Sequence, residues 1–342
     1  MTHPRSLTPA DDATGPEADV ASASGRPEPA TDEPVAEGAP RGGRAAAVLA
    51  VLGVAWLAAT LWSAHATLTR SGGLQALNEA ALALPAIFTA SLVAGVAVGF
   101  AAAQLSGPRV PRAVAGLGGG LVIGLAVAAL ILLGYGSTSA LVVLAAAMAA
   151  TSLIGGAASI VRPPAIVGAT VAGSLAWVVL SLLEAGLYNR LLKLLGAGTS
   201  VASQVTATHR LALAAAVCGG IVAGVVAYRY LRRRPDGLGW PAYLAAGAGP
   251  GVLLLVADLV TLIAGGRLRS LAAASSEADR AALTWASNVG LNTALVVLFV
   301  GAITSTIAFG RTLGPSAPEA EPAAATPQSG SQAPEAGPDQ TS

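Results

Sequence analysis

The sequence predicts an all-α integral membrane protein with about eight transmembrane helices between two disordered tails. Of its 342 residues, 54% are hydrophobic and only 11% are charged, whereas a soluble domain carries about 25% charged residues. Charge also gathers at the ends, since residues 1–44 hold eight acids and residues 312–342 hold four. A surface with so few charges cannot face water, so we expect the lipid bilayer to cover most of it.

Eight apolar segments have the length that a membrane span needs. A hydrocarbon core of about 30 Å requires about 20 helical residues at 1.5 Å each. Abundant Ala and Leu favour helices over the strands of a barrel. The expected spans are 45–65, 82–105, 113–134, 139–160, 165–187, 209–230, 241–264 and 287–310. The connecting segments 187–195 and 267–286 are predicted to form short helices on the membrane surface.

The two tails, residues 1–44 and 312–342, are predicted to be disordered and cytoplasmic. Both are rich in Pro, Ala and acids, and such segments bury too little apolar surface to offset chain entropy. The first lacks the apolar stretch of a signal peptide. Ten bases near the membrane lie on the side of the tails and seven on the other side. The positive-inside rule therefore places the tails in the cytoplasm. Eighteen arginines beside one lysine indicate a GC-rich genome, and so a bacterial plasma membrane.

Arg232, Arg233 and Arg234 form the densest basic cluster near the membrane. Such a cluster marks the cytoplasmic side of a span. It also has the composition that binds anionic lipid head groups. The sequence leaves both interpretations open.

The two halves, residues 45–160 and 161–311, resemble each other. The matches occur in order along the chain, as expected of a tandem repeat of four plus four spans. Four spans are an even number, so both halves insert in the same direction, with a pseudo-two-fold axis along the membrane normal. The matched segments are 55–64 with 176–185, Gly95 and Gly99 with Gly220 and Gly224, Gly119 with Gly249, and 139–144 with 293–298.

Five polar residues in the outer third of the second half form the candidate intramembrane site. Asp258 and Glu184 are the two acids inside expected spans, where a charge costs at least a few kcal/mol. Asp258 lies roughly 9 Å below the outer end of its span, and Thr261 shares its helix face. Asn288 and Asn292 begin the last span on one face. These residues form either a functional site or a polar rim at the membrane interface.

Gly249, Pro250 and Gly251 predict an interruption of the seventh span, one to two turns before Asp258. Proline removes a backbone hydrogen bond, and glycine loosens the helix. An interrupted helix beside an acid is typical of substrate and ion sites. The alternative is a kink that serves packing.

The sequence lacks a nucleotide-binding loop and the common hydrolase signatures. A single cysteine, Cys218, excludes an internal disulfide, and His65 and His209 lack a third metal ligand. We therefore expect no enzyme activity, no cofactor, no metal and no nucleic-acid partner.

The expected function is that of a transporter-like or lipid-handling protein. The alternative is a non-catalytic membrane subunit or scaffold. Protein partners and oligomeric state stay open.

Overall fold

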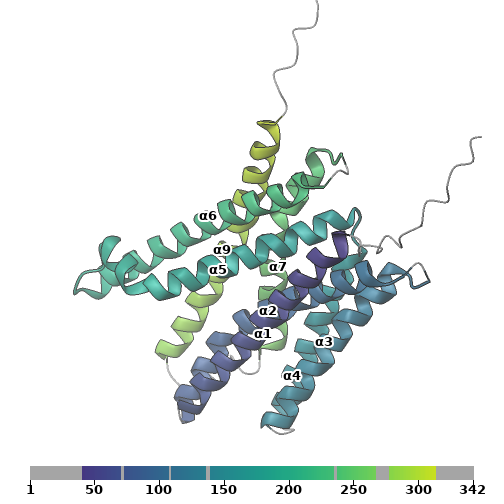
Figure 1. Cartoon of the computed structure of the whole chain (residues 1–342). Helices are drawn as coiled ribbons and strands as arrows, with labels where there is room; N and C mark the ends of the chain where they lie inside the picture. The colour runs from purple at the N-terminus through teal and green to yellow at the C-terminus, as the bar shows by residue number, and fades with distance from the viewer. Residues whose placement is uncertain are drawn as a thin grey trace, which may run out of the picture. The chain divides into compact units, whose positions relative to one another are not determined.

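The computed structural model describes residues 41–70, 73–107, 109–135, 139–234, 237–266 and 277–312. In these ranges all regular secondary structure is helical, and eight helices are long and apolar enough to cross a membrane (Figure 1). This confirms the predicted fold class at that level. The helices are α1 (Arg41–Arg70), α2 (Gly73–Leu105), α3 (Arg112–Tyr135), α4 (Ser139–Ala157), α5 (Pro164–Leu194), α6 (Val201–Arg232), α7 (Trp240–Ala264) and α9 (Glu277–Gly310), with a short 3-10 turn η1 (Ala158–Ile160) after α4.

Several helices extend beyond the predicted spans. α9 has 34 residues and α5 has 31, so α9 is about 50 Å long at 1.5 Å per residue. The surface helix predicted at 187–195 is wrong as a separate element, because α5 continues unbroken to Leu194. No proline interrupts it, and it ends before Gly196, whose φ of 92° suits glycine.

The second predicted surface segment, 267–286, is only partly described. Residues 277–286 belong to α9, and 267–276 lie outside the described residues. The predicted tails also lie outside them, apart from 41–44, which start α1, and Arg311–Thr312, which follow α9.

Local sequence signals mark the start of the second-half helices. Pro164 occupies the first turn of α5, where the missing N–H costs no helical bond. Ser200 caps α6 by accepting a hydrogen bond from the Ser203 backbone N–H at 3.2 Å. Pro241 stands in the first turn of α7.

Large apolar side chains cover the outer faces of the helices. Leu133 is 86% exposed, Leu194 81% and Ile263 75%. A soluble monomer rarely exposes so many large apolar side chains, whereas lipid tails cover them without cost. The chain is therefore a multi-pass helical membrane protein.

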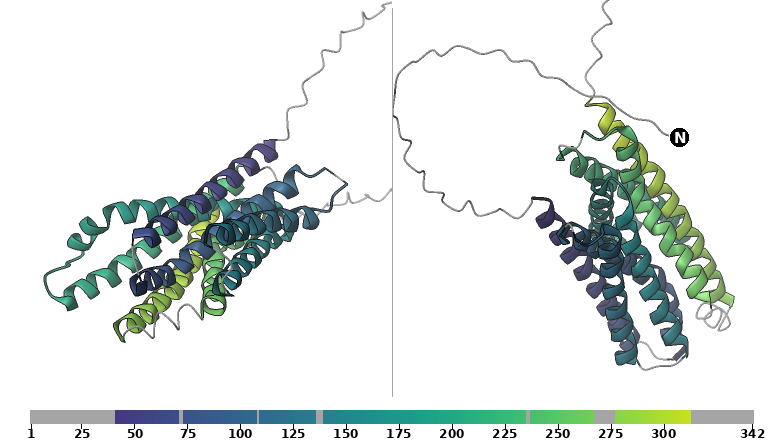
Figure 2. Two further views of the ribbon diagram at one scale, coloured as in Figure 1. Left: turned by 90° about the horizontal axis from the view of Figure 1, so that it is seen from below. Right: turned by 90° about the vertical axis from the view of Figure 1, so that its right-hand side faces the viewer.

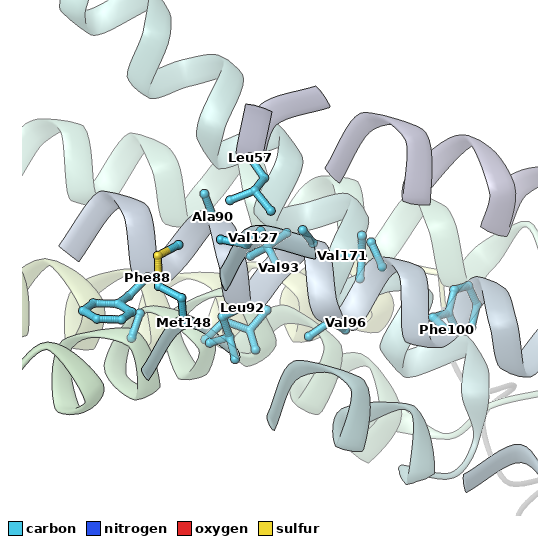
Figure 3. Close-up of a cluster of buried hydrophobic side chains, with 14 of the residues drawn as sticks. Leu57, Phe88, Ala90, Leu92, Val93, Val96, Phe100, Val127, Met148 and Val171 are labelled. Atoms are coloured by element: carbon cyan, nitrogen blue, oxygen red, sulfur yellow. The ribbon is translucent and has the colours of Figure 1, made fainter. Parts of the chain in front are cut away.

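The main hydrophobic core surrounds α2. In the most apolar window of α2, 67% of residues are buried, against 22% in α1 and α9, so α2 is the central helix. Phe88 and Leu92 of α2 pack with Met148 of α4 in this core, which also includes Val171 of α5 (Figure 3). Since Leu253 of α7 belongs to the same cluster, one core joins the two halves.

Helix pairs approach each other backbone to backbone at glycines. A Cβ added to Gly95 of α2 would lie 2.8 Å from Ser152 Cα of α4, and one added to Gly120 of α3 would lie 2.6 Å from the Ser152 carbonyl oxygen. Small residues allow such approach in membranes. The Ser91 and Ser152 hydroxyls add an interhelical hydrogen bond of 2.7 Å between α2 and α4.

Within each half the helices pair in a similar way. α1 packs on α2 and α3 on α4 in the first half, and α5 packs on α6 and α7 on α9 in the second (Figures 1 and 2). Contacts between the halves are not reciprocal. α2 packs on α5 and α7, whereas α6 makes no comparable contact with α1 or α3 in the described part of the chain. A two-fold axis would require both sets of contacts, so these contacts do not support the predicted axis.

Candidate functional site

A cavity of about 340 Å³ lies where the two halves meet. Five helices contribute to its lining: α1, α2, α5, α7 and α9. Its walls are mainly carbon. The polar and aromatic side chains among its lining residues are Trp56, Thr89, Trp177, Ser181, Asp258 and Thr293.

Asp258 supplies the carboxylate of this cavity. It is half-buried on α7, and its side chain lies against Gly290 of α9. A Cβ added to Gly290 would lie 3.3 Å from both carboxylate oxygens. The absence of a side chain at Gly290 therefore makes room for the carboxylate at the cavity wall.

Two hydroxyl groups of the cavity already donate their protons to backbone carbonyls. Thr89 Oγ1 donates to the Pro85 carbonyl oxygen at 2.7 Å. Ser181 Oγ donates to the Trp177 carbonyl oxygen at 3.0 Å. A hydroxyl group has one donor and two acceptor lone pairs. Thr89 and Ser181 can therefore offer a ligand only acceptor oxygens.

Trp56 and Trp177 provide the aromatic part of the lining. Both are half-buried. The six-membered ring of Trp177 lies directly against Gly219 of α6, in the space that a Cβ at Gly219 would fill. The other three tryptophans, Trp62, Trp240 and Trp285, are 75%, 57% and 45% exposed, and tryptophans at lipid-facing surfaces are typical of membrane interfaces.

A second cavity of about 370 Å³ adjoins the first, since Trp56, Ala86 and Leu182 line both. It follows α1 from Trp56 to Thr67, a distance of about 16 Å along the helix axis. Glu79 of α2 lines this second cavity. Each of the two adjoining cavities therefore has one carboxylate in its lining.

Of the five predicted site residues, Asp258 is thus the one that lines the first cavity, of about 340 Å³. Thr261 is 2% exposed, and its hydroxyl donates to the Ala257 carbonyl oxygen at 2.8 Å, so it serves helix packing. Glu184 and Asn288 line neither of the two large cavities. Glu184 is half-buried on α5, and Asn288 is exposed on α9.

Asn292 lies at a separate, small cavity of about 40 Å³ between α6 and α9. His209 of α6 lines the same cavity. Thr293, the residue after Asn292, lines both this cavity and the first cavity, of about 340 Å³. The structure therefore divides the five predicted residues among different surroundings and does not gather them in one site.

The predicted interruption at Gly249, Pro250 and Gly251 is wrong. α7 is one continuous helix from Trp240 to Ala264, with Pro250 inside it. These three residues are buried, and neighbouring helices hold the backbone in place. A Cβ added to Gly173 of α5 would lie 3.0 Å from the Pro250 ring, and one added to Gly251 would overlap Leu298 of α9. The residues around Pro250 are thus closely packed against α5 and α9.

Arg232 and Arg234 are engaged with tyrosines of their own helix. Arg232 donates to the Tyr228 hydroxyl at 2.7 Å, and Arg234 donates to the Tyr230 hydroxyl at 2.9 Å. Their guanidinium groups also lie 5.9 Å and 5.2 Å from the ring centroids of these tyrosines. Arg233, at the C-cap of α6, is exposed.

Sequence reasoning missed Trp56, Trp177, Thr89 and Glu79 as lining residues. One signal was available, because Trp56 and Trp177 occupy matching places in the two halves, yet it was used only as a sign of the repeat. No signal identified Thr89 or Glu79. Both depend on which face of α2 meets the second half.

The geometry and the apolar outer faces define the class of protein, a multi-pass helical membrane protein with a carboxylate-containing cavity inside its helix bundle. No protein-family model, no curated protein and no solved structure matches the chain. Any more specific function must therefore be argued from this site.

Proposed function

We propose that the chain is a transporter-like membrane protein that binds its substrate in the cavity around Asp258. The observation that carries this proposal is the position of the carboxylate. Asp258 lines a cavity of about 340 Å³ between the two halves of the bundle, within a helix long enough to span the membrane. A charge within an apolar span costs stability. A protein that served only as a scaffold would gain nothing from such a charge.

The glycine contacts support a repeat of two four-helix units. Gly120 of α3 lies against Ser152 and Gly156 of α4. Gly247 of α7 lies in the same way against Gly301 and Ser305 of α9. The contacting residues have the same spacing in both units, but their register differs from the predicted match of Gly119 with Gly249 and of 139–144 with 293–298.

The next turn repeats the correspondence, because Gly124 meets Ala149 and Gly251 meets Leu298. Two similar units that share one core provide a natural place for a site between them. The non-reciprocal contacts between the halves make this site asymmetric, with its deep carboxylate on the second unit.

For orientation, we propose that both termini face the cytoplasm of a bacterial cell. Positive residues on the side of the tails support this. Single cysteines at Arg233 and Ser200, in a chain with Cys218 replaced by Ala, should react with a membrane-impermeant maleimide from opposite sides. Reaction of both from the same side would overturn the topology.

A flux assay on reconstituted full-length protein tests the transport proposal. Proteoliposomes would be supplied with a labelled amino acid, sugar, carboxylic acid and quaternary amine. We expect uptake of at least one solute, loss of that uptake in Asp258→Asn, and retention in Glu184→Gln. Glu184 is a matched control, because it is the other acid predicted inside a span and lines neither large cavity. Wild-type flux in Asp258→Asn, or no flux above empty vesicles, would overturn the proposal.

A second role concerns lipid. We propose that Arg233, exposed between two arginines that are held by tyrosines, binds the head group of an anionic lipid. In nanodiscs, Arg233→Ala should enrich less phosphatidylglycerol around the protein than the wild type does. Equal enrichment would leave the cluster as a topology marker.

A role as a non-catalytic subunit is the alternative function. A partner that copurifies with the chain and depends on the cytoplasmic tails would favour it. We assign no catalytic step to the chain.

A further inference from the structure

We propose that the substrate of the two adjoining cavities is a lipophilic organic monocation. This inference rests on the proposed function, because it assigns a chemical class to the ligand of the same site. It is drawn from the charge, the hydrogen-bonding character and the aromatic content of the lining.

The charges of the lining are acidic. Asp258 lines the first cavity and Glu79 the second. Among the described residues that line the two cavities, none is a lysine, an arginine or a histidine. In the low dielectric of a membrane protein, a lining whose ionisable side chains are carboxylates favours a cation over an anion.

The hydroxyl groups favour the same class. Thr60 Oγ1 donates to the Trp56 carbonyl oxygen at 2.9 Å, and Thr67 Oγ1 donates to the Ser63 carbonyl oxygen at 3.0 Å. With Thr89 and Ser181, four of the six lining hydroxyls donate their protons to the backbone, and Ser63 and Thr293 are the other two. The four that donate can accept hydrogen bonds or stabilise positive charge, whereas an anion needs donors.

The aromatic rings and the carbon-rich walls distinguish an organic cation from a metal ion. Indole is the best aromatic partner for a cation near its face, and the first cavity contains both Trp56 and Trp177. Hard metal cations require six or more oxygen ligands for Ca²⁺, or retained waters for Mg²⁺. A volume of about 340 Å³ falls within the range of small-molecule pockets, about 300–1,000 Å³.

Binding of radiolabelled tetraphenylphosphonium to the full-length protein in nanodiscs tests this assignment. We expect saturable binding that unlabelled benzyltrimethylammonium displaces. The neutral analogue triphenylphosphine oxide should not displace it. Displacement by the neutral analogue at the same concentration would show that shape alone governs binding, and would overturn the proposal.

The variants locate the site. Asp258→Asn should weaken tetraphenylphosphonium binding by about tenfold or more, since it removes the charge at the cavity wall. Glu184→Gln should bind as the wild type does. Unchanged affinity in Asp258→Asn would overturn the assignment.

If Asp258→Asn does not fold, the tryptophans give an independent test. Trp177→Phe keeps an aromatic ring but weakens the cation–π attraction, so affinity should fall by about threefold. Trp285→Phe, at an exposed position, is the matched control and should leave affinity unchanged. Equal affinity in the two variants would count against the cation assignment.

The outcomes separate this inference from the transport proposal. Binding that depends on Asp258 without flux would support the substrate class and overturn transport. Flux of another solute that depends on Asp258, with no binding of tetraphenylphosphonium, would support transport and overturn the substrate class.

Discussion

Replacing Gly120 by alanine tests whether backbone contact between α3 and α4 stabilises the bundle. An added Cβ would lie 2.6 Å from the Ser152 carbonyl oxygen and 2.8 Å from Gly156 Cα. Both neighbours are backbone atoms, so no flexible side chain can move aside. The two helices must separate for the methyl group to fit.

Gly118 is the matched control. It lies two residues earlier on α3, is exposed, and a Cβ there would meet nothing within 4 Å. Alanine in place of glycine favours a helix by about 0.5–1 kcal/mol at either position. Overpacking costs about 1–3 kcal/mol and applies only at Gly120. The helix-propensity gain is common to both variants, so the difference between them, about 1–3 kcal/mol, is the packing cost alone.

The free energy of unfolding would be measured by reversible SDS titration of each full-length variant in mixed micelles. We expect Gly118→Ala to be as stable as the wild type or more stable, and Gly120→Ala to be less stable than Gly118→Ala. Equal stability of the two variants would refute the close contact between α3 and α4.

Two further predictions concern a buried hydrogen bond and the position of an indole. The hydroxyls of Ser91 and Ser152 are 2.7 Å apart between α2 and α4, so alanine at each position should reveal a coupling of about 0.5–1.5 kcal/mol in a double-mutant cycle of unfolding; strictly additive effects would contradict the bond. Gly219→Ala fills the space where the Trp177 ring lies, so it should shift the tryptophan emission spectrum in the wild-type background but not in Trp177→Phe, and a shift of equal size in both backgrounds would contradict the contact.

Sequence reasoning recovered the helices better than the site. Hydrophobic length alone predicted eight spans, because the bilayer thickness sets how many apolar residues a span needs. It misjudged where helices end, since the last turns of α5 lie outside the apolar stretch yet have no residue that stops a helix before Gly196. It also predicted a break at Pro250, where α7 is continuous and the proline is buried between neighbouring helices.

Asp258 was predicted as a site residue because a charge within an apolar span is costly wherever its side chain points. The other residues that line the cavity with Asp258 were not predictable in the same way. Glu184 is also an acid inside an expected span, but it lines neither large cavity. The sequence places both acids in spans and cannot say which helix face meets a neighbour.

The sequence by itself determined that this chain consists of long apolar helices, one of which carries an acid within its apolar stretch. That information is local, since span length and hydropathy depend only on neighbouring residues and on the bilayer. Tertiary structure alone decided that α2 is the central helix and that Trp56 and Trp177 share a cavity with Asp258. Lipid tails are as apolar as leucine, so hydrophobicity does not choose partners among membrane helices. The fit of small residues such as Gly95 and Gly290 against their neighbours makes that choice, and it emerges only when the helices are packed together.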